Sequence, residues 1–252
     1  MLIVEDILRR FKGKTALIVG GRRVGQVVAK ALAELGVNII VTYRDSQKEA
    51  MATVVMAKKF GVKALALKMD ASTRESVQDA LGQVKKTFKK IDILLVMPSV
   101  FGVVAFDDVS PEDLKKNIDA HLYGTFWPVQ IFSRIMPKGS TIVNVSDRTS
   151  SGRVYTDYSP YVISKIAVTG ITRTASTELA SKGIIVNEIA PGPLLRPPHI
   201  TLKEWQSNRK SPLSIILDDA EAQRQFAWLV VYLSQNKGAT GYTYFLDQGK
   251  NL

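Results

Sequence analysis

The feature that most constrains the fold of this chain is a regular alternation of short apolar runs with longer amphipathic stretches. The apolar runs predict strands at residues 15–20, 37–43, 64–69, 91–96, 141–146, 184–189 and 243–246. Helical patterns lie between them, near 24–35, 46–60, 72–89, 110–136, 159–181 and 217–235, after a short helical segment within residues 1–14. This alternation is typical of a parallel seven-stranded sheet with helices on both faces and right-handed crossovers. We therefore expect an α/β protein built as one doubly wound domain over residues 1–252.

Composition narrows the classes of function. The chain of 252 residues has no cysteine, which excludes disulfides, thiolate metal sites and a cysteine nucleophile and favours a cytoplasmic location. Its two histidines, His121 and His199, are too few for a convincing metal site. The net charge is +11, but the lysine pairs are spread over several predicted helices and form no focused basic stripe, so we expect no nucleic-acid partner. No apolar run reaches the roughly 20 residues that cross a bilayer, and the first 14 residues lack a signal-peptide core, so we expect no membrane segment.

A glycine-rich turn joins the first predicted strand to the first predicted helix. Glycines at this point let the backbone turn tightly and let a phosphate approach the amino terminus of the helix. The turn after the first strand is also where a dinucleotide pyrophosphate docks in doubly wound domains. A glycine-rich turn without a ligand is the alternative. The turn consists of Gly20, Gly21, Arg22, Arg23, Val24 and Gly25.

The ends of the next two strands bear on the choice of cofactor. Arg44 follows the second strand, where an arginine can hold the 2′-phosphate of NADP, and Arg22 and Arg23 add positive charge. Asp45 could instead bind the ribose hydroxyls of NAD. We expect NADP(H) first, with NAD(H) as the alternative. Asp70, after the third strand, is either an acceptor for the adenine amino group or a helix cap near Ser72.

Tyr161 and Lys165 are four residues apart in a predicted helix, which places a phenol and an ammonium on one face. A phenol with a pKa near ~10 is a poor acid–base catalyst at neutral pH. A nearby cation favours the phenolate and lowers that pKa. The pair therefore suits proton exchange with a carbonyl or alcohol oxygen.

With these pieces in order, the chain resembles the short-chain dehydrogenase/reductase family, which has a Rossmann fold. The segments 141–146, 187–193 and 241–249 add to the resemblance, which covers nearly the whole chain. The resemblance implies that Tyr161 is the general acid of ketone reduction and that Lys165 tunes it and holds the nicotinamide ribose. It also implies that Pro191 and Gly192 form the turn beside the nicotinamide, and that residues 193–216 form the substrate-binding loop. A homodimer or homotetramer packed through helices 110–136 and 159–181 is expected as well.

Several positions depart from the usual family pattern. Arg23 stands where the middle glycine of the turn would be, as in pteridine-reductase-like members. Pro98 lies in a segment, 96–99, that replaces the usual Asn-Asn-Ala-Gly and changes the wall behind the adenosine ribose. Asp147, after Ser146, stands where the family has its catalytic serine. His121 aligns with the helix asparagine that supports the active-site lysine through water.

These substitutions leave alternatives open. Asp147 either holds the substrate, as an acceptor or as a neutral donor, or only caps the following loop. Ser146 either helps to position the substrate or faces the core. His121 is either a proton-relay group or a structural hydrogen-bonding residue. Tyr158 lies seven residues before Lys165, a spacing similar to that of enoyl reductases, although Tyr161 matches the commoner pattern; Tyr155 is a further aromatic nearby.

The sequence therefore predicts an NADP(H)-dependent oxidoreductase that acts on a small-molecule carbonyl or alcohol, with Tyr161 as the proton donor or acceptor. C=C or pteridine-type reduction is the alternative enzyme reaction. A catalytically silent NADP(H)-binding sensor or scaffold is the alternative of a different class. The loop after Gly192 mixes apolar and basic residues, and nothing in it identifies the substrate.

Overall fold

The computed structural model describes residues 2–154, 156–196, 201–203, 205, 215 and 217–251. At its centre is one seven-stranded sheet in the order β3-β2-β1-β4-β5-β6-β7, and every neighbouring pair is parallel. The order reverses direction beside β1, as in doubly wound folds. The strands are β1 (Thr15–Val19), β2 (Asn38–Tyr43), β3 (Ala64–Lys68), β4 (Ile93–Val96), β5 (Thr141–Val145), β6 (Ile185–Pro191) and β7 (Thr243–Leu246).

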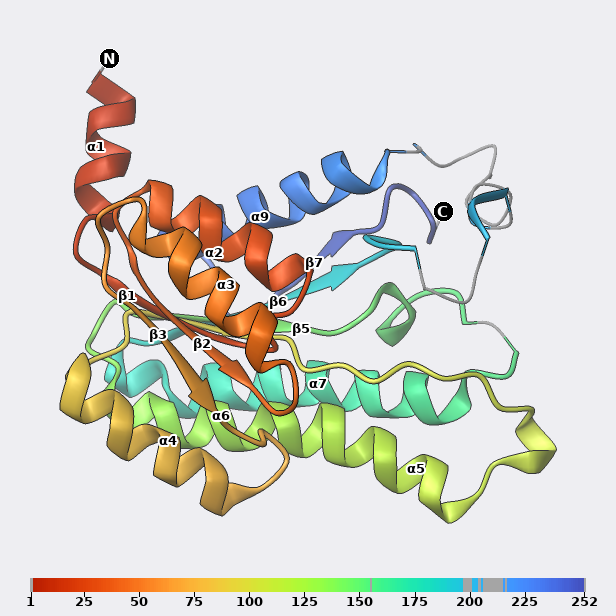
Figure 1. The fold of residues 1–252 in the computed structure, drawn as a ribbon. Helices are drawn as coiled ribbons and strands as arrows, with labels where there is room; N and C mark the ends of the chain where they lie inside the picture. Colours follow the sequence, from red (N-terminus) through yellow and green to blue (C-terminus); the bar gives the residue numbers. More distant parts are fainter. Residues whose placement is uncertain are drawn as a thin grey trace.

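Helices cover both faces of the sheet (Figure 1). One face carries α2 (Val24–Glu34), α3 (Gln47–Lys58) and α9 (Asp219–Gln235), and the other carries α4 (Arg74–Thr87), α5 (Pro111–Ile118), α6 (Gly124–Phe132) and α7 (Ser159–Glu178). The first helix, α1 (Leu2–Phe11), extends from one end of this body. The α/β fold predicted from the sequence is confirmed, with all seven strands within two residues of their expected limits.

Two apolar clusters, one on each side of the sheet, hold these layers together. Alternate residues of a strand point to opposite faces, so Ile18 packs with α2 and α9 whereas its neighbour Val19 packs with α4 and α6. The central strands are buried on both faces, and β1, β4 and β5 contain no exposed residue. This explains why their sequences are continuous apolar runs rather than alternating ones.

The predicted helix 110–136 differs from the structure. It is divided into α5, a π-helical turn η2 (Asp119–Tyr123), α6 and a 3-10 turn η3 (Ser133–Ile135). Ser110 caps α5 through a reciprocal capping box with Asp113, which fixes where the helix begins. The π-helical turn carries His121 and turns it inward, where it is fully buried.

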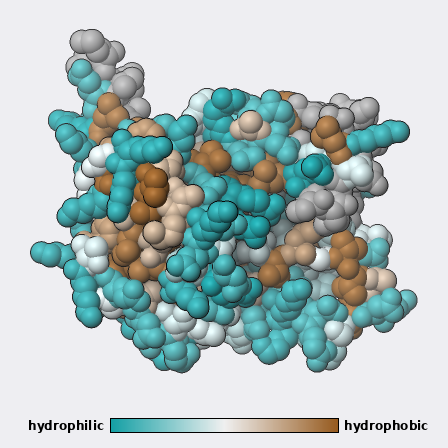
Figure 2. All heavy atoms as spheres, in the orientation of Figure 1, coloured by the Kyte–Doolittle hydropathy of each residue, from teal (hydrophilic) through white to brown (hydrophobic). Residues whose placement is uncertain are grey.

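The surface is mostly polar. Figure 2 shows apolar atoms in several separate patches among hydrophilic side chains on the face that it draws. In the part of the chain that the structure describes, no helix has both the length and the apolar character needed to cross a membrane. Because all strands are parallel, their carboxyl ends lie at one edge, and the loops that leave this edge build the candidate site.

Candidate active site

The turn after β1 brings the backbone unusually close to the neighbouring strand's loop. Gly20 has φ +85°, and a Cβ there would lie 2.6 Å from the carbonyl oxygen of Met97. A Cβ on Gly25 would lie 3.0 Å from the carbonyl oxygen of Gly20, while Gly21 packs on Val41. Arg23, the residue before α2, has φ 53°, and Val24 is buried at the first position of α2. Glycine at position 20 is therefore required both by conformation and by space.

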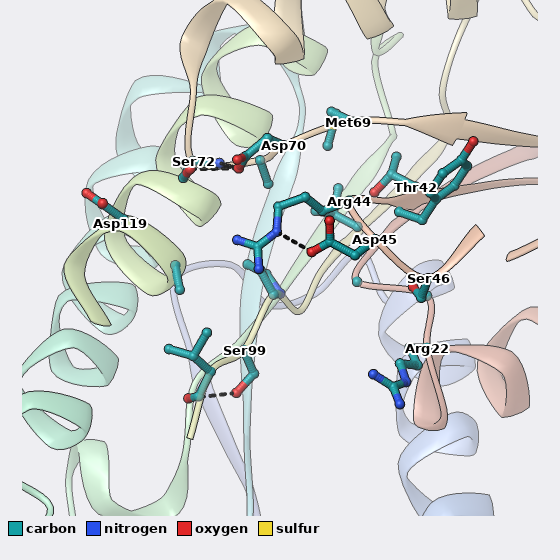
Figure 3. A pocket seen from close by; sticks show the side chains of 18 of the residues that line it. Arg22, Thr42, Arg44, Asp45, Ser46, Met69, Asp70, Ser72, Ser99 and Asp119 are labelled. Atoms are coloured by element: carbon teal, nitrogen blue, oxygen red, sulfur yellow. Dashed lines mark hydrogen bonds and ion pairs between the residues drawn. The ribbon is translucent and has the colours of Figure 1, made fainter. Parts of the chain in front are cut away.

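A cavity of about 750 Å³ lies in front of this turn (Figure 3). It is lined at the carboxyl ends of β1, β2 and β3 and, across from them, by α5 and residues 98–100. Arg22 and Arg44 both line it, and Figure 3 shows the Arg44 guanidinium turned toward Asp45. The Arg44 Nε lies 2.8 Å from Asp45 Oδ2, and the Arg22 Nε lies 3.7 Å from Glu49 Oε1. The cavity as described is not lined by Arg23.

The other residues expected to touch a cofactor lie around the same edge. Asp70 lines the cavity, and its Oδ1 accepts hydrogen bonds from Ser72 N and Ser72 Oγ at 2.9 and 2.6 Å. Asp70 thus organises the turn before α4 and also faces the cavity. Pro98 lines the cavity too and packs against α6 at Gly124.

Pro191 and Gly192 close β6 against β7. The Gly192 N–H donates to the Leu246 carbonyl at 3.0 Å, and a Cβ on Gly192 would lie 2.9 Å from the Asp247 Cα. This close approach fixes the turn that leads into the expected substrate-binding loop. Most of that loop, residues 193–216, lies outside the described residues, as do His199 and Tyr155.

Tyr161 and Asp147 are joined directly. The Tyr161 hydroxyl donates to Asp147 Oδ2 at 2.9 Å. Asp147 Oδ1 accepts from Thr149 N and Thr149 Oγ1 at 2.9 and 2.8 Å, so the carboxylate both caps its loop and faces the phenol. Burial, and then the charge of Asp147, raises the pKa of Tyr161 well above its usual value. This direction is opposite to the one expected from Lys165 alone, and it keeps the phenol protonated.

Lys165 lies one turn after Tyr161 and is buried on the same side of α7. Its Nζ donates to the carbonyl oxygen of Val145 at 3.1 Å and lies 5.9 Å from the centre of the Tyr161 ring. Burial lowers the pKa of Lys165 to about 8, and the negative charges of Asp147 and Glu188 oppose that fall. The ammonium therefore remains the main form at neutral pH.

His121 is held by both ring nitrogens. Its Nε2 accepts from the Val100 N–H at 3.2 Å, and its Nδ1 lies 2.8 Å from Ser164 Oγ, which itself donates to the Tyr161 carbonyl at 2.8 Å. These partners fit the neutral ring with its hydrogen on Nδ1. Burial, followed by the charge of Lys165, lowers the pKa of His121 to about 2. With both nitrogens engaged, this geometry favours the structural alternative over the proton relay.

Ser146 faces the interior rather than Tyr161. Its hydroxyl donates to the Glu188 carboxylate, and it lies 3.4 Å from Ser150 Oγ. Glu188, on β6, is fully buried, and sequence reasoning did not single it out. The available signal in the sequence was an ionisable residue inside the mainly apolar run 184–189, which was expected to form a strand.

Phe101 is a second residue that the sequence did not indicate. Its ring centre lies 5.2 Å from that of Tyr161, edge to face, and 5.5 Å from that of Tyr158. Phe101 is 49% exposed, whereas Tyr161 is 8% exposed. The approach to the Tyr161 phenol is therefore bounded by an aromatic side chain.

The residues present fit a dinucleotide. The positive-φ Gly20, its neighbour Gly21 and the two arginines line one cavity, which is also lined by Asp119 and Ala120, on the helical segment that carries His121. A cradle that a Cβ at Gly20 or Gly25 would disturb suits the close approach of a phosphate. Among the described residues, no group of three or more histidine, aspartate or glutamate side chains could hold a metal ion.

Comparisons with known proteins agree with this geometry. The family profile described as "Enoyl-(Acyl carrier protein) reductase" matches residues 21–251. Glucose 1-dehydrogenase 2 of Bacillus subtilis is 29% identical over 251 residues, 95% of this chain and 95% of that protein. The 3-oxoacyl-[acyl-carrier-protein] reductase FabG of Staphylococcus epidermidis is 30% identical over 182 residues, 71% of this chain and 74% of that protein.

Solved structures are similar over the whole chain. A short chain dehydrogenase from Burkholderia cenocepacia J2315, in complex with NADP, superposes with a TM-score of 0.87 at 26% identity. The match covers 96% of this chain and all of that one. Fold, glycine turn and matched profile agree, and the chain belongs to the short-chain dehydrogenase/reductase family of oxidoreductases.

Proposed function

We propose that this protein is an NADP(H)-dependent oxidoreductase that reduces a carbonyl group, or oxidises the corresponding alcohol, with Tyr161 as the proton donor or acceptor. The observation that carries the proposal is the hydrogen-bonded phenol of Tyr161, one helical turn from the buried Lys165 ammonium. When bound, the cofactor supplies the hydride chemistry, and the protein supplies orientation and charge.

The chain's own residues divide the remaining tasks. Gly20, Gly21 and Gly25 with the amino end of α2 receive the pyrophosphate, and Arg22 and Arg44 receive the 2′-phosphate. Pro98 and Asp70 bound the adenosine, and Pro191 with Gly192 bounds the nicotinamide. Lys165 holds the nicotinamide ribose. The relative solved with NADP supports this choice of cofactor, and Asp45 beside Arg44 is the residue that would favour NAD(H).

The proton is handled by Tyr161 with Asp147. In reduction, the Tyr161 O–H bond breaks and its proton passes to the substrate oxygen as that oxygen gains negative charge. The raised pKa of Tyr161 keeps this proton in place before the substrate arrives. Before the substrate binds, Asp147 accepts the hydrogen bond of the Tyr161 hydroxyl and fixes its orientation. The substrate oxygen then replaces Asp147 as the acceptor of that hydrogen bond.

The substrate is small and its identity is open, because the relatives' names refer to different substrates. The half-exposed Phe101 above Tyr161 also suits an enone or a planar ring, which keeps C=C and pteridine-type reduction as the second candidate. Assembly into a dimer or tetramer through α6 and α7 is part of the proposal, since Ile163 and Ile166 of α7 are about half exposed.

A spectrophotometric screen tests the proposal. NADPH consumption is followed with panels of ketones and aldehydes, enones, and pterins, and NADH serves as the matched cofactor control. We expect saturable NADPH consumption with at least one carbonyl substrate. Saturable NADPH binding without turnover on any panel would support the sensor or scaffold instead.

A further inference from the structure

The face of α7 that meets the sheet is unusually polar below the Tyr161 hydroxyl. Lys165, Thr169 and Thr172 are spaced four and three residues apart and lie on this face. Opposite them, β5 and β6 present Asn144, Ser146 and Glu188. We call this group of six residues the polar seam. It occupies a place between helix and sheet that is otherwise apolar.

Glu188 lies within the polar seam and is fully buried. Its Oε1 accepts hydrogen bonds from Ser146 Oγ and from Thr169 Oγ1, the latter at 2.9 Å. Its register partner on β5 is Asn144, whose Nδ2 donates to Thr172 Oγ1 at 3.0 Å. Two hydroxyl donors on one oxygen are the partners that a carboxylate prefers.

Burying the carboxyl of Glu188 costs folding free energy. Among the described residues, neither Glu188 Oε2 nor Asn144 Oδ1 has a hydrogen-bond donor. Burial raises the pKa of Glu188, and the donated hydrogen bonds and the charge of Lys165 oppose the rise. An acid in this position is explained most simply by a nearby cation that its charge stabilises.

Lys165 is that cation. It is 2% exposed, and its Nζ donates to the carbonyl of Val145, the residue before Ser146. It precedes Thr169, a direct partner of Glu188, by one turn of α7. The ionisable groups that face Lys165 are Asp147 after β5, Glu188 on β6, Tyr161 on α7 and His121 of η2, which is neutral.

We propose that Glu188 is a positioning residue for Lys165: its buried carboxylate keeps the Lys165 side chain charged and held beneath Tyr161. The charge of Asp147 also opposes the fall in the pKa of Lys165, but its oxygens are hydrogen-bonded to the Tyr161 hydroxyl and to Thr149, so Glu188 supplies a second negative charge on the side of β6. The effect on turnover rests on the proposed function, whereas the coupling of the two charges does not.

The direct test is an NMR titration of Lys165 in the full chain labelled with 13Cε-lysine, with the signal assigned through Lys165→Arg. In Glu188→Gln, which has nearly the same shape without the charge, we expect the pKa of Lys165 to fall by about one pH unit or more. Glu188→Asp retains a carboxylate and is expected to restore most of the difference. In the active enzyme, the alkaline limb of the kcat profile moves to lower pH by the same amount, with the substrate KM little changed.

Asp92→Asn is the matched control. Asp92 is also a buried carboxylate of this sheet, and it accepts from Thr15 N and Lys90 Nζ, both at 2.9 Å, but it lies at the amino ends of the strands. The same chemical change there is expected to leave the Lys165 titration unchanged. An equal shift in both variants would mean that general loosening of the fold, and not Glu188, moves Lys165.

Identical Lys165 titrations in the parent and Glu188→Gln would overturn the proposal, because a neutral Glu188 that donates to Asn144 exerts no field on Lys165. If Glu188→Gln does not fold, the 13Cδ signal of Glu188 in the parent decides: an ionised group at pH 7 supports the proposal, and a protonated one overturns it. A shifted Lys165 titration in a protein that consumes no NADPH would leave the charge coupling intact and defeat the proposed function.

Discussion

At the scale of single residues, the candidate site contains one buried cation, Lys165, and two nearby acids, Asp147 and Glu188. Two acids act on the charge of Lys165: Asp147, which accepts from the Tyr161 hydroxyl, and Glu188, which accepts from Ser146 and Thr169. Each pKa direction follows from this arrangement: burial lowers that of Lys165 and raises those of Tyr161 and Glu188. The proton is therefore kept on the Tyr161 phenol, the form that the proposed proton transfer to a substrate oxygen requires.

The proposed preference for NADP(H) assigns the 2′-phosphate to Arg44. Arg44→Ala is expected to weaken NADPH binding about 10–100-fold, the loss of one charged hydrogen-bonding partner, and to change NADH binding far less. Fluorescence titration with both cofactors measures this difference. Arg9→Ala, in α1, is the control for loss of one positive charge. If Arg44→Ala weakened the binding of NADPH and NADH equally, Arg44 would not be the residue that holds the 2′-phosphate.

His121 makes stability depend on pH. Its pKa of about 2 in the folded chain lies far below the ordinary value of 6.5, so the unfolded chain binds the proton more readily. Its stabilising contribution is complete above about pH 6.5 and is lost as the pH falls, by about 1.4 kcal/mol per pH unit. Between pH 6 and pH 4, the unfolding free energy measured with urea should fall less steeply with pH in His121→Asn than in the parent, by about 1.4 kcal/mol per pH unit. The same pH dependence of the unfolding free energy in the parent and in His121→Asn would mean that the His121 ring is charged or exposed in the folded chain.

At the scale of elements, the strands were predictable because each buried strand is a continuous apolar run bounded by turns. The break in the 110–136 helix was not, since the π-helical turn at Asp119–Tyr123 depends on contacts of His121 with Val100 and Ser164, which are distant in sequence. The same limit applies to the site. Spacing placed Tyr161 and Lys165 together, but Glu188 reaches their helix only through tertiary contacts, with Ser146 beside β5 and with Thr169 on α7.

The turn after β1 offers an element-scale test. Gly20 and Gly61 both have positive φ, at +85° and +76°, yet a Cβ at Gly61 meets nothing within 4 Å. Gly61→Ala is expected to cost about 1 kcal/mol of unfolding free energy, from conformation alone. Gly20→Ala adds a clash with Met97 and should cost about 1–3 kcal/mol more and abolish NADPH binding. Urea unfolding and NADPH titration compare the two variants. An equal loss of unfolding free energy in Gly20→Ala and Gly61→Ala would contradict the close packing of Gly20 against Met97.

At the scale of the whole molecule, one parallel sheet brings loops from distant parts of the chain to a single edge. The residues after β1, β2 and β3 form the cavity, and those after β5 and β6 carry Asp147 and Gly192. The segment after β7 contacts the same edge: Asn251 Nδ2 donates to the Arg148 carbonyl at 3.2 Å, and Asp247 packs on Gly192. The loop that carries Asp147 and Arg148 is thus supported by the segment that follows β7.

Assembly is the prediction at this scale. Ile166 is 48% exposed on the side of α7 away from the sheet, with Ile163 one turn before it. We expect light scattering to give a dimer or tetramer for the parent and a smaller species for Ile166→Glu, because a carboxylate is costly to bury in such a contact. Glu178→Gln, at the exposed end of the same helix, is the control. A monomeric parent would contradict the expected assembly.

The central claim, that Tyr161 transfers the proton, is tested most directly by steady-state NADPH turnover of Tyr161→Phe beside Tyr158→Phe. Both rings pack against Phe101, so the two variants remove the same atom from two tyrosines that share this neighbour. We predict a loss of about 100-fold or more in kcat for Tyr161→Phe, with NADPH affinity nearly unchanged, and a small effect for Tyr158→Phe. Equal rates for Tyr161→Phe and the parent, or the larger loss in Tyr158→Phe, would contradict the account.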